Sequence, residues 1–236
     1  MLLWYYSRVV RLVTATTAID AAGFGVNYLH MDILSKNRQT YEALAPQYEE
    51  KVTVRRDFNT AVVRRFASHI TSGKEVLDIG CAVGLDMAIF ASLGFTVAGL
   101  DIAPSMVKFA KKRNPEAEIY CMDFMEYQAE RTFDAIFAQA LIHLFPKGKV
   151  GDLLDKIYTS LNDGGTLFVT TSKSLESKEG WFEKSDYSGK HKRFRKFWTT
   201  EELQEFLGAH GFQPVDYYEI TDPYQKTWMV FTLRKG

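Results

Sequence analysis

Short apolar runs alternate with longer amphipathic stretches along most of the chain. The apolar runs read as strands at residues 75–79, 96–100, 119–122, 135–138 and 166–171. Helical periodicity occupies 55–70, 85–93, 104–112, 150–161 and the stretch that ends near Gly208. Strands that alternate with helices are typical of a parallel sheet with crossover helices. Two last apolar segments, 215–220 and 228–233, predict an antiparallel hairpin. The pattern therefore predicts a doubly wound α/β domain.

Two segments depart from this alternation. Residues 1–36 predict a helical extension, because apolar residues between Leu2 and Val13 recur at the spacing of one helix face. Arg8, Arg11 and Asp20 interrupt the apolar run before it reaches the roughly 20 residues that span a bilayer. No signal-peptide cleavage pattern follows them. We expect this extension to pack on the main domain, 37–236, or on a second copy in a homodimer, with binding to a membrane surface as the alternative.

The second departure is a polar and aromatic stretch, 172–198, which predicts a long inserted loop. It follows the fifth strand, so it would lie at the carboxyl edge of the sheet, where ligands bind in open α/β folds. Its basic cluster, 190–196, is expected to be solvated. Binding of an acidic substrate or of an RNA backbone is the alternative interpretation of that cluster.

Composition narrows the classes of partner. The 236 residues contain 29 Lys and Arg against 29 Asp and Glu, so no net charge draws the chain toward nucleic acid or an anionic membrane. Cys81 and Cys121 show neither CxxC spacing nor neighbouring histidines, so no metal site and no structural disulfide is indicated. We expect a cytoplasmic protein with a small-molecule partner.

A glycine-bearing loop carries the first chemical signal. The first strand ends in Asp78-Ile79-Gly80, and Cys81-Ala82-Val83-Gly84 opens the next helix. Glycines let the backbone approach a ligand, and main-chain N–H groups at a helix start are expected to be free for it. Asp101 closes the second strand, where a carboxylate can accept ribose hydroxyls. The dinucleotide template fits poorly, because Ala82 and Leu85 replace its second and third glycines.

Read as acidic-x-Gly-x-Gly-x-Gly, the loop matches at Asp78, Gly80 and Gly84, with Ala82 in place of the middle glycine. It resembles motif I of the class I S-adenosylmethionine-dependent methyltransferases, of the type that acts on small molecules. The resemblance extends from about residue 41 to the end. It implies a mostly parallel, seven-stranded, Rossmann-like sheet, S-adenosylmethionine as cofactor, S-adenosylhomocysteine as product and no metal.

The same resemblance implies roles for individual residues in this first part of the chain. Gly80 and Gly84 would line the methionine moiety, Asp78 would hold its amino group, and Asp101 would take the ribose hydroxyls. Cys81 fills the loop beside the cofactor. Taken singly, Asp78 could merely cap a helix; its spacing to the other motifs favours the cofactor role.

Further motifs follow in the family's order. Ile102 and Met106 would lie against the adenine. Asp123-Phe124 resembles the family's pair that meets the adenine amino group and packs its ring, although Asp123 alone could begin a turn. Gln139 and Ala140, at the end of the fourth strand, would lie beside the reacting methyl group.

Three side chains are candidates for a role at the reacting centre. Tyr41 and Tyr48 resemble the Tyr-x-x-x-Ala-x-x-Tyr entry seen before motif I, where tyrosines close over the cofactor; a ring face attracts a sulfonium cation. Plain packing is the alternative. His143 is the candidate general base, because it follows the fourth strand closely and histidine titrates near neutral pH. The alternative role of His143 is structural, to support the cofactor loop.

The reaction implied is in-line methyl transfer to oxygen or nitrogen of a small metabolite. No Asp/Asn-Pro-Pro-Tyr/Phe sequence occupies the fourth-strand end, which disfavours methylation of DNA bases. Two alternatives stay open. An intramolecular alkylation would release methylthioadenosine, and a non-catalytic module would bind a nucleoside or RNA.

Overall fold

The computed structural model describes residues 26–183 and 187–236. Its elements run in this order: α1 (Val26–Glu50), α2 (Val52–Ala67), β1 (Glu75–Ile79), α3 (Leu85–Ser92), β2 (Thr96–Asp101), α4 (Pro104–Arg113), β3 (Glu118–Cys121), β4 (Phe133–Ala138), the 3-10 turn η1 (Ile142–Leu144), α5 (Lys147–Ser160), β5 (Leu161–Ser172), β6 (Lys178–Glu183), β7 (Lys192–Phe197), α6 (Thr200–Ala209), β8 (Phe212–Thr221) and β9 (Thr227–Lys235). The strands and helices predicted between residues 55 and 233 are all present.

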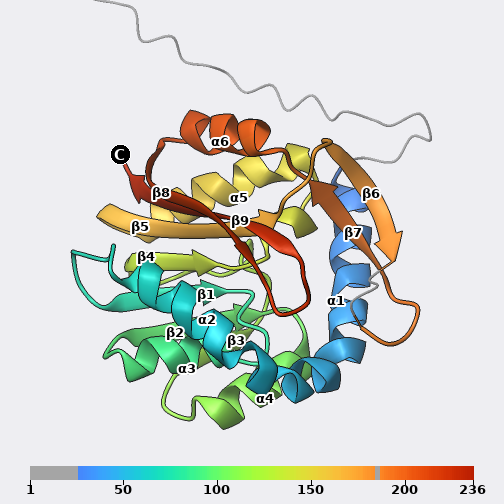
Figure 1. Ribbon diagram of the computed structural model, residues 1–236, viewed down its shortest axis with the longest axis horizontal. Helices are drawn as coiled ribbons and strands as arrows, with labels where there is room; N and C mark the ends of the chain where they lie inside the picture. The colour runs from blue at the N-terminus through green and yellow to red at the C-terminus, as the bar shows by residue number, and fades with distance from the viewer. Residues whose placement is uncertain (1–25, 184–186) are drawn as a thin grey trace, which may run out of the picture.

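One seven-stranded sheet organises the molecule, in the order β3-β2-β1-β4-β5-β9-β8 (Figure 1). The strands from β3 to β5 are parallel, whereas β9 pairs antiparallel with both β5 and β8. The chain order reverses at β1 and β4, so the space beyond their carboxyl ends is where this fold binds ligands. The predicted doubly wound sheet and its terminal hairpin are confirmed.

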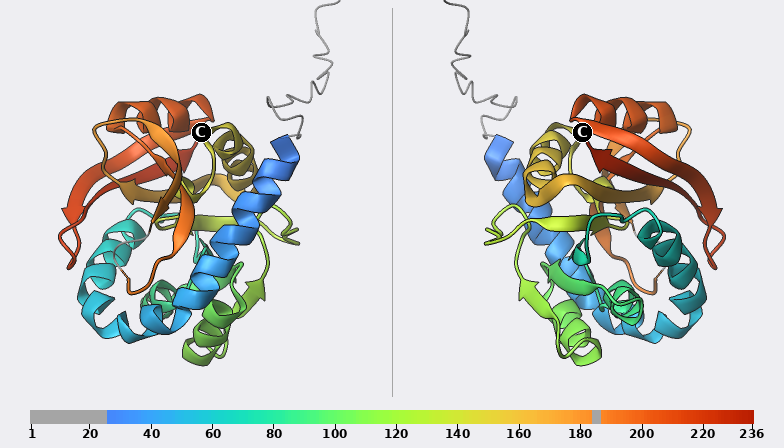
Figure 2. Two further views of the ribbon diagram at one scale, coloured as in Figure 1. Left: turned by 90° about the vertical axis from the view of Figure 1, so that its right-hand side faces the viewer. Right: turned by 90° about the vertical axis from the view of Figure 1, so that its left-hand side faces the viewer.

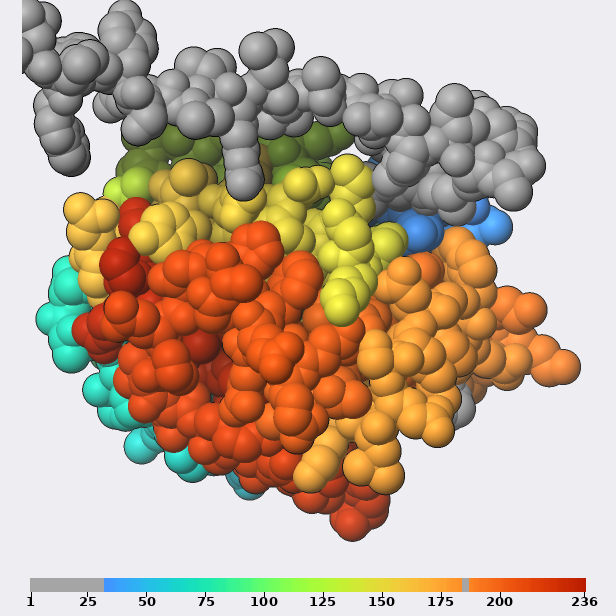
Figure 3. Space-filling view, turned by 90° about the horizontal axis from the view of Figure 1, so that it is seen from above, coloured from blue at the N-terminus to red at the C-terminus, as the bar shows by residue number. Residues whose placement is uncertain are grey.

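Helices cover both faces of the sheet. On one face α2, α3 and α4 pack on a cluster in which Phe137 of β4 stacks on Phe168 of β5 at 4.2 Å and meets Phe66 and Phe90 edgewise or tilted. On the other face α5 and α6 cover Ile136 and its neighbours, and Figure 3 shows these two helices side by side from above. Both faces are apolar, which explains why β4 is a continuous buried run.

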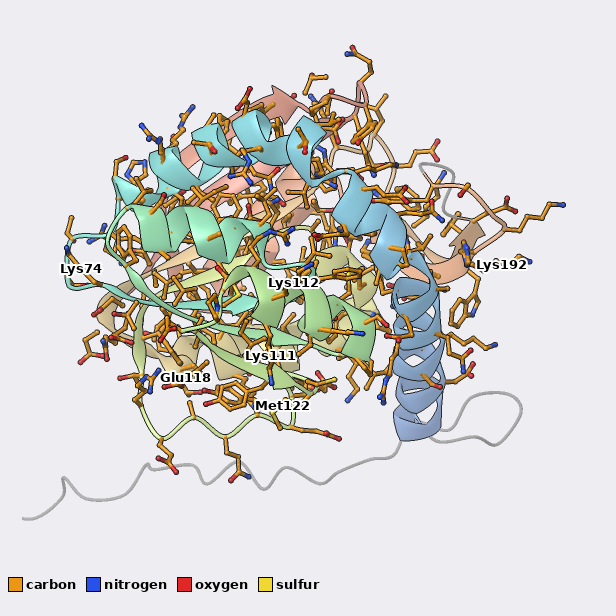
Figure 4. All side chains as sticks on the ribbon, turned by 90° about the horizontal axis from the view of Figure 1, so that it is seen from below. Lys74, Lys111, Lys112, Glu118, Met122 and Lys192 are labelled. Atoms are coloured by element: carbon orange, nitrogen blue, oxygen red, sulfur yellow. The ribbon has the colours of Figure 1, made fainter. Side chains whose placement is uncertain are left out.

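The remaining helix and a small hairpin close the end of the sheet. Figure 2 (left) shows α1 crossing diagonally in front of that end, with the β6–β7 hairpin beside it. Lys74, just before β1, and Lys192, the first residue of β7, lie at opposite ends of the molecule in Figure 4. Since Lys74 marks the amino end of β1, α1 and β7 mark the carboxyl end.

The long loop predicted for 172–198 is wrong in part, because β6 and β7 pair there as an antiparallel ribbon. Cross-strand aromatic contacts stabilise this ribbon, Trp181 on Phe194 and Phe182 on Phe197. The expectation of a solvated basic cluster is wrong for three of its five cations, whereas Lys190 and Lys192 are exposed. Arg193, Arg195 and Lys196 are only 4%, 8% and 2% exposed, because the ribbon lies against α1 and η1 and its cations bond to groups of the main domain.

The predicted extension meets the structure only at its end. The part of it before Val26 lies outside the described residues, and α1 continues without a break across the predicted boundary between 36 and 37. Among the described helices, none combines the length and the apolar character needed to cross a bilayer.

Candidate cofactor and acceptor site

A large cavity opens at the carboxyl ends of β1, β2 and β4, under α1 and the β6–β7 ribbon. Every predicted site residue except Asp78 and Gly84 lines it: Tyr41, Tyr48, Gly80, Cys81, Asp101, Ile102, Met106, Asp123, Phe124, Gln139, Ala140 and His143. The sequence motifs therefore converge on one place, although they are spread over about a hundred residues.

The loop after β1 is shaped by hydrogen bonds within the protein. The N–H groups of Gly80 and Cys81 both donate to the Leu100 carbonyl, at 2.8 and 2.9 Å, and the Ala82 N–H donates to Asp101. The expectation of N–H groups free for a ligand is thus wrong for these three residues. Gly80 has φ +77° and Ala82 has φ +47°, left-handed values that turn the chain sharply. Four residues of this loop, 80–83, line the cavity.

Gly84 does not line the cavity. Its missing side chain instead allows close packing of two helices. A Cβ at Gly84 would lie 2.9 Å from Ala110 Cα and 2.6 Å from Asn114 Nδ2. That amide nitrogen donates to the Gly84 carbonyl at 2.9 Å. The glycine lets the start of α3 approach α4, which positions the loop from behind.

Asp101 is held rigidly at the end of β2. Its Oδ2 accepts from the Ala82 N–H at 3.0 Å and its Oδ1 from the Ala103 N–H at 2.9 Å. Burial raises the pKa of Asp101 to about 6, while these two bonds oppose the shift. The carboxylate keeps further lone pairs that could accept hydroxyl groups from a ligand.

Asp78 lies behind the loop at 2% exposure, and its Oδ2 has no hydrogen-bond partner within the protein. Burial raises the pKa of Asp78 well above its usual range, and the nearby carboxylates of Asp86 and Asp101 raise it further. A cation bound near it would relieve this penalty.

Asp86, Asn59 and Arg55 also line the cavity, and the sequence analysis did not identify them. Asp86 stands in the first turn of α3 and accepts a 2.7 Å bond from Asn59 Nδ2 of α2. Burial raises the pKa of Asp86 to about 6, while Asn59 and the Arg55 charge oppose the shift. Only the packing of α2 on α3 brings these residues together, so no local motif marks them.

Aromatic side chains line the side of the cavity under α1. The ring of Tyr48 stacks on Tyr187, which precedes β7, with centroids 4.6 Å apart, and its edge meets Tyr41. Arg193 Nη1 donates to the Tyr41 hydroxyl at 2.5 Å. Burial and the neighbouring tyrosines raise the pKa of Tyr48 well above its usual range, so its hydroxyl stays protonated.

Two residues near the end of β4 present polar groups to the cavity. His143 in η1 is 1% exposed, and its Nδ1 lies 3.3 Å from the Thr171 hydroxyl. Gln139 Oε1 is buried without a hydrogen-bond partner. Ala140 adopts φ +55°, and its N–H donates to Thr170. The buried Gln139 Oε1, an acceptor, and the His143 ring thus both lie near the carboxyl end of β4.

Asp123 and Met122 follow β3 and complete this side of the cavity. Met122 is labelled near the end of β3 in Figure 4. Asp123 Oδ1 accepts from the Met125 N–H at 3.0 Å, which begins a turn, and Phe124 is 3% exposed. The described residues include no group of three or more His, Cys, Asp or Glu that could hold a metal ion.

Comparison with known proteins decides the family. A model of a methyltransferase domain matches residues 49–217, well over half of the chain. The chain belongs to this methyltransferase family. The match covers the loop after β1, Asp101, Asp123 and the end of β4, so the predicted resemblance is confirmed.

Curated relatives of this methyltransferase-domain chain are distant. A ubiquinone biosynthesis O-methyltransferase from Azorhizobium caulinodans is 27% identical over 172 residues, 67% of this chain and 66% of the relative. A dTDP-3-amino-3,6-dideoxy-alpha-D-glucopyranose N,N-dimethyltransferase from Streptomyces fradiae is 26% identical over 111 residues, 46% of this chain and 42% of the relative. The chain thus spans less than two thirds of these curated relatives.

Solved structures share the fold. A 1,6-didemethyltoxoflavin-N1-methyltransferase from Burkholderia thailandensis, solved with 1,6-didemethyltoxoflavin and S-adenosylhomocysteine, superposes with a TM-score of 0.71 at 21% identity, over 87% of this chain and 90% of that one. An amino pentose methyltransferase from Micromonospora echinaspora, solved with S-adenosylmethionine, superposes with a TM-score of 0.59 at 17% identity, over 80% of this chain and 96% of that one.

Proposed function

We propose that this protein transfers a methyl group from S-adenosylmethionine to an oxygen or nitrogen of a small-molecule acceptor and releases S-adenosylhomocysteine. One observation carries the proposal. The loop after β1 and the acidic residues Asp101 and Asp123, each at the end of its own strand, line one cavity in a chain of the methyltransferase family. The family match disfavours the alternatives of an intramolecular alkylation and of a non-catalytic module.

The residues present fit this cofactor. Asp101 offers acceptors to the ribose hydroxyls, and Asp123 offers one to the adenine amino group, with Phe124, Ile102 and Met106 as apolar neighbours. The unpartnered Oδ2 of Asp78 stands behind the loop where the ammonium group would come close. Hydroxyls, an amine and an ammonium are all donors, which matches a site that presents mainly acceptors.

The bound cofactor supplies a methyl group on a positively charged sulfur, and the protein has to align the acceptor with it and exclude water. Gln139 Oε1 and Ala140 line the wall beside the methyl group. Tyr41 and Tyr48 present aromatic rings on the side under α1, where a ring face stabilises a sulfonium. We assign Tyr41 to closing this side of the site.

His143 has two candidate roles. As a base it would take a proton from an acceptor that is protonated at neutral pH; as a support it would hold the end of β4 through its contact with Thr171. Substitution His143→Ala separates them. Loss of turnover with retained cofactor binding supports the base, whereas unchanged turnover removes His143 from the catalytic residues.

Calorimetry tests the proposed function. We expect the pure protein to bind S-adenosylhomocysteine with a micromolar dissociation constant, and Asp101→Asn to weaken binding at least about tenfold, since a charge-assisted hydrogen bond contributes about 1.5–3 kcal/mol. Lys178→Gln, an exposed position on β6 outside the cavity, serves as the control. Absence of heat with millimolar ligand, or release of methylthioadenosine from the methyl donor, would contradict the proposal.

We also propose a homodimer formed through the residues before α1. Light scattering of the full chain should then give about twice the 27.0 kDa of one copy, and a chain that starts at Val26 should give a single copy. If the full and the shortened chains contain the same number of copies per particle, the first 25 residues do not join the copies.

A further inference from the structure

The charged side chains that line the cavity balance one another. Among the described residues that line it, four carboxylates accompany four cations: Asp86, Asp101, Asp123 and Asp222, and Lys51, Arg55, Arg193 and Lys226. Neither sign of charge is in excess, so the lining as a whole selects neither an anion nor a cation. Recognition of the methyl acceptor then has to come from its shape, from apolar contact and from individual hydrogen bonds.

One wall of the cavity runs from α1 across η1 to β9, next to the carboxyl end of β4. Asn37 Nδ2 of α1 donates to the Leu144 carbonyl of η1 at 3.3 Å, and the ring of His143, also in η1, lies 6.3 Å from that of Trp228 in β9. The apolar residues of this wall are Ile33, Leu34, Leu144, Phe145 and Trp228. The wall therefore favours a molecule with an apolar body.

Trp228 gives this wall a flat and fixed surface. Its indole Nε1 donates to Oδ2 of the buried Asp222 at 2.9 Å. Asp222 Oδ1 accepts from the N–H groups of Tyr224 and Lys226 at 2.9 and 3.0 Å, which fixes the turn between β8 and β9. Lys226 Nζ lies over the indole at 4.7 Å, and the ring still lines the cavity. A ring that is already held packs against a flat partner with little further loss of rotamer freedom.

Gln139 places a hydrogen-bond acceptor beside Trp228. Both residues line the large cavity and also a small side cavity between α2 and the sheet. Gln139 Oε1 is buried and has no hydrogen-bond partner among the described residues, which costs free energy as long as no donor reaches it. The terminal torsion of a glutamine is soft, so the oxygen can turn toward a donor in the cavity. This oxygen therefore favours a substrate that brings its own O–H or N–H group.

We propose that the methyl acceptor is an uncharged molecule with a flat ring, which lies against Trp228 and donates the hydrogen of its reacting O–H or N–H group to Gln139 Oε1. This inference rests on the proposed function. The hydrogen bond fixes the reacting atom near the end of β4 and leaves one of its lone pairs for the methyl carbon. When that lone pair bonds to carbon, the electron pair of the carbon–sulfur bond stays with sulfur, and the hydrogen leaves as a proton to water or to His143.

Trp228 and Gln139 are thus specificity-determining residues with separate tasks. Trp228 selects a flat ring by contact of two planar surfaces, whereas Gln139 selects a hydrogen-bond donor, because a molecule without one leaves its oxygen unpaired. Trp181 of β6 offers a matched control. It is 41% exposed and is not among the residues that line the cavity.

The experiment uses the full chain saturated with S-adenosylhomocysteine and three probes that share one two-ring skeleton. 2-Naphthol is flat and carries a donor, 2-fluoronaphthalene is flat and carries none, and decahydro-2-naphthol keeps the hydroxyl group but is not flat. Calorimetry should show 2-naphthol binding about fivefold tighter than each of the other two, as expected of one hydrogen bond and of one contact between aromatic rings.

Two substitutions should remove different parts of this preference. Trp228→Leu should bind 2-naphthol and decahydro-2-naphthol about equally and keep the preference for hydroxyl over fluorine, and Gln139→Leu should do the reverse. Trp228→Phe, which keeps a ring, and the control Trp181→Leu should retain both preferences. A change in one ratio alone separates recognition from a general loss of stability, because unfolding weakens the binding of all three probes alike.

The outcomes distinguish this inference from the proposed function. Failure to bind S-adenosylhomocysteine would overturn the proposed function itself. With normal binding of that ligand, no binding of 2-naphthol at millimolar concentration, or equal affinities for the three probes, would overturn the flat, uncharged acceptor alone. Tighter binding of the charged probes 2-naphthoate or 2-naphthylmethylamine than of 2-naphthol would also overturn it. Loss of both preferences in the Trp181→Leu protein would show that they do not arise from the cavity wall.

Discussion

Three carboxylates lie around the loop after β1, the buried Asp78 and the partly buried Asp86 and Asp101, and each is harder to ionise than in water. Burial is the largest cause for all three, and their mutual repulsion raises the pKa of Asp78 further. Such groups destabilise the folded chain at neutral pH. A donor-rich or cationic ligand offsets that cost, so the residues that weaken the fold are the ones that favour binding.

Ligand affinity should follow the ionisation of Asp101. Its pKa of about 6 predicts that S-adenosylhomocysteine binds about tenfold more weakly at pH 5 than at pH 7, because the protonated carboxyl loses acceptor capacity. Calorimetry across this range gives the profile. In Asp101→Asn the dependence should flatten, and a wild-type profile with no change near pH 6 would contradict the assignment.

The raised pKa of Asp101 affects folding stability in the opposite direction to ligand affinity: affinity rises with pH, whereas stability falls. Because the folded-state pKa of Asp101 is raised from 3.8 to about 6, the native chain binds the proton more tightly than the unfolded chain in this window. The contribution of Asp101 to the free energy of unfolding therefore falls as pH rises from 3.8 to about 6. Urea titrations of the wild type and of Asp101→Asn, which lacks the group, measure the difference.

At the scale of elements, tight contacts between helices place the loop after β1. The first turn of α3 and the middle of α4 approach closely only because Gly84 has no side chain. The loop's own hydrogen bonds to Leu100 and Asp101 then fix it on β2. The position of this loop thus depends on a glycine that does not line the cavity.

A pair of glycine substitutions tests this dependence. Gly84→Ala adds both a left-handed alanine, at φ +74°, and a clash with Ala110 and Asn114, whereas Gly164→Ala adds only the left-handed alanine, at φ +70°, with no atom within 4 Å. We expect losses of about 3 kcal/mol and about 1 kcal/mol in the free energy of unfolding, measured in urea. Equal losses would show that α4 adjusts freely.

The β6–β7 ribbon illustrates why an element can escape sequence analysis. Six of the twelve residues in its strands are Lys, Glu or Gly, which are depleted in strands generally. Its order comes from contacts with distant parts, such as the bond of Arg193 to Tyr41 and of Lys196 to Glu202. A local pattern of polar residues cannot predict contacts with such distant partners.

At the scale of the whole molecule, the cavity joins α1, the sheet and the ribbon, so a ligand should stabilise all of them together. At a concentration 100 times its dissociation constant, S-adenosylhomocysteine should add about 2.7 kcal/mol to the free energy of unfolding. For a domain of this size that corresponds to a rise of about 5–10 °C in Tm. Differential scanning calorimetry measures it.

Two controls accompany this thermal experiment. NADH should leave Tm unchanged, because Ala82 and Leu85 occupy the positions where a dinucleotide loop needs glycine. Asp101→Asn should shift less than the wild type at the same ligand concentration. A rise in Tm with NADH equal to that with S-adenosylhomocysteine would contradict the choice of cofactor.

The amino-acid sequence by itself determined the order of the strands of the main sheet and of the helices between them, the glycine-bearing loop, and the acidic residues that end β2 and follow β3. These features are local: periodicity, glycine and a strand-end carboxylate need only a few neighbouring residues to be recognised. Tertiary structure alone decided that the loop's N–H groups bond inward, that Gly84 packs against α4, and that Asn59 meets Asp86. It also decided that cations from α2, β7 and the β8–β9 turn share one cavity, because burial and charge pairing depend on residues brought together from distant parts of the chain.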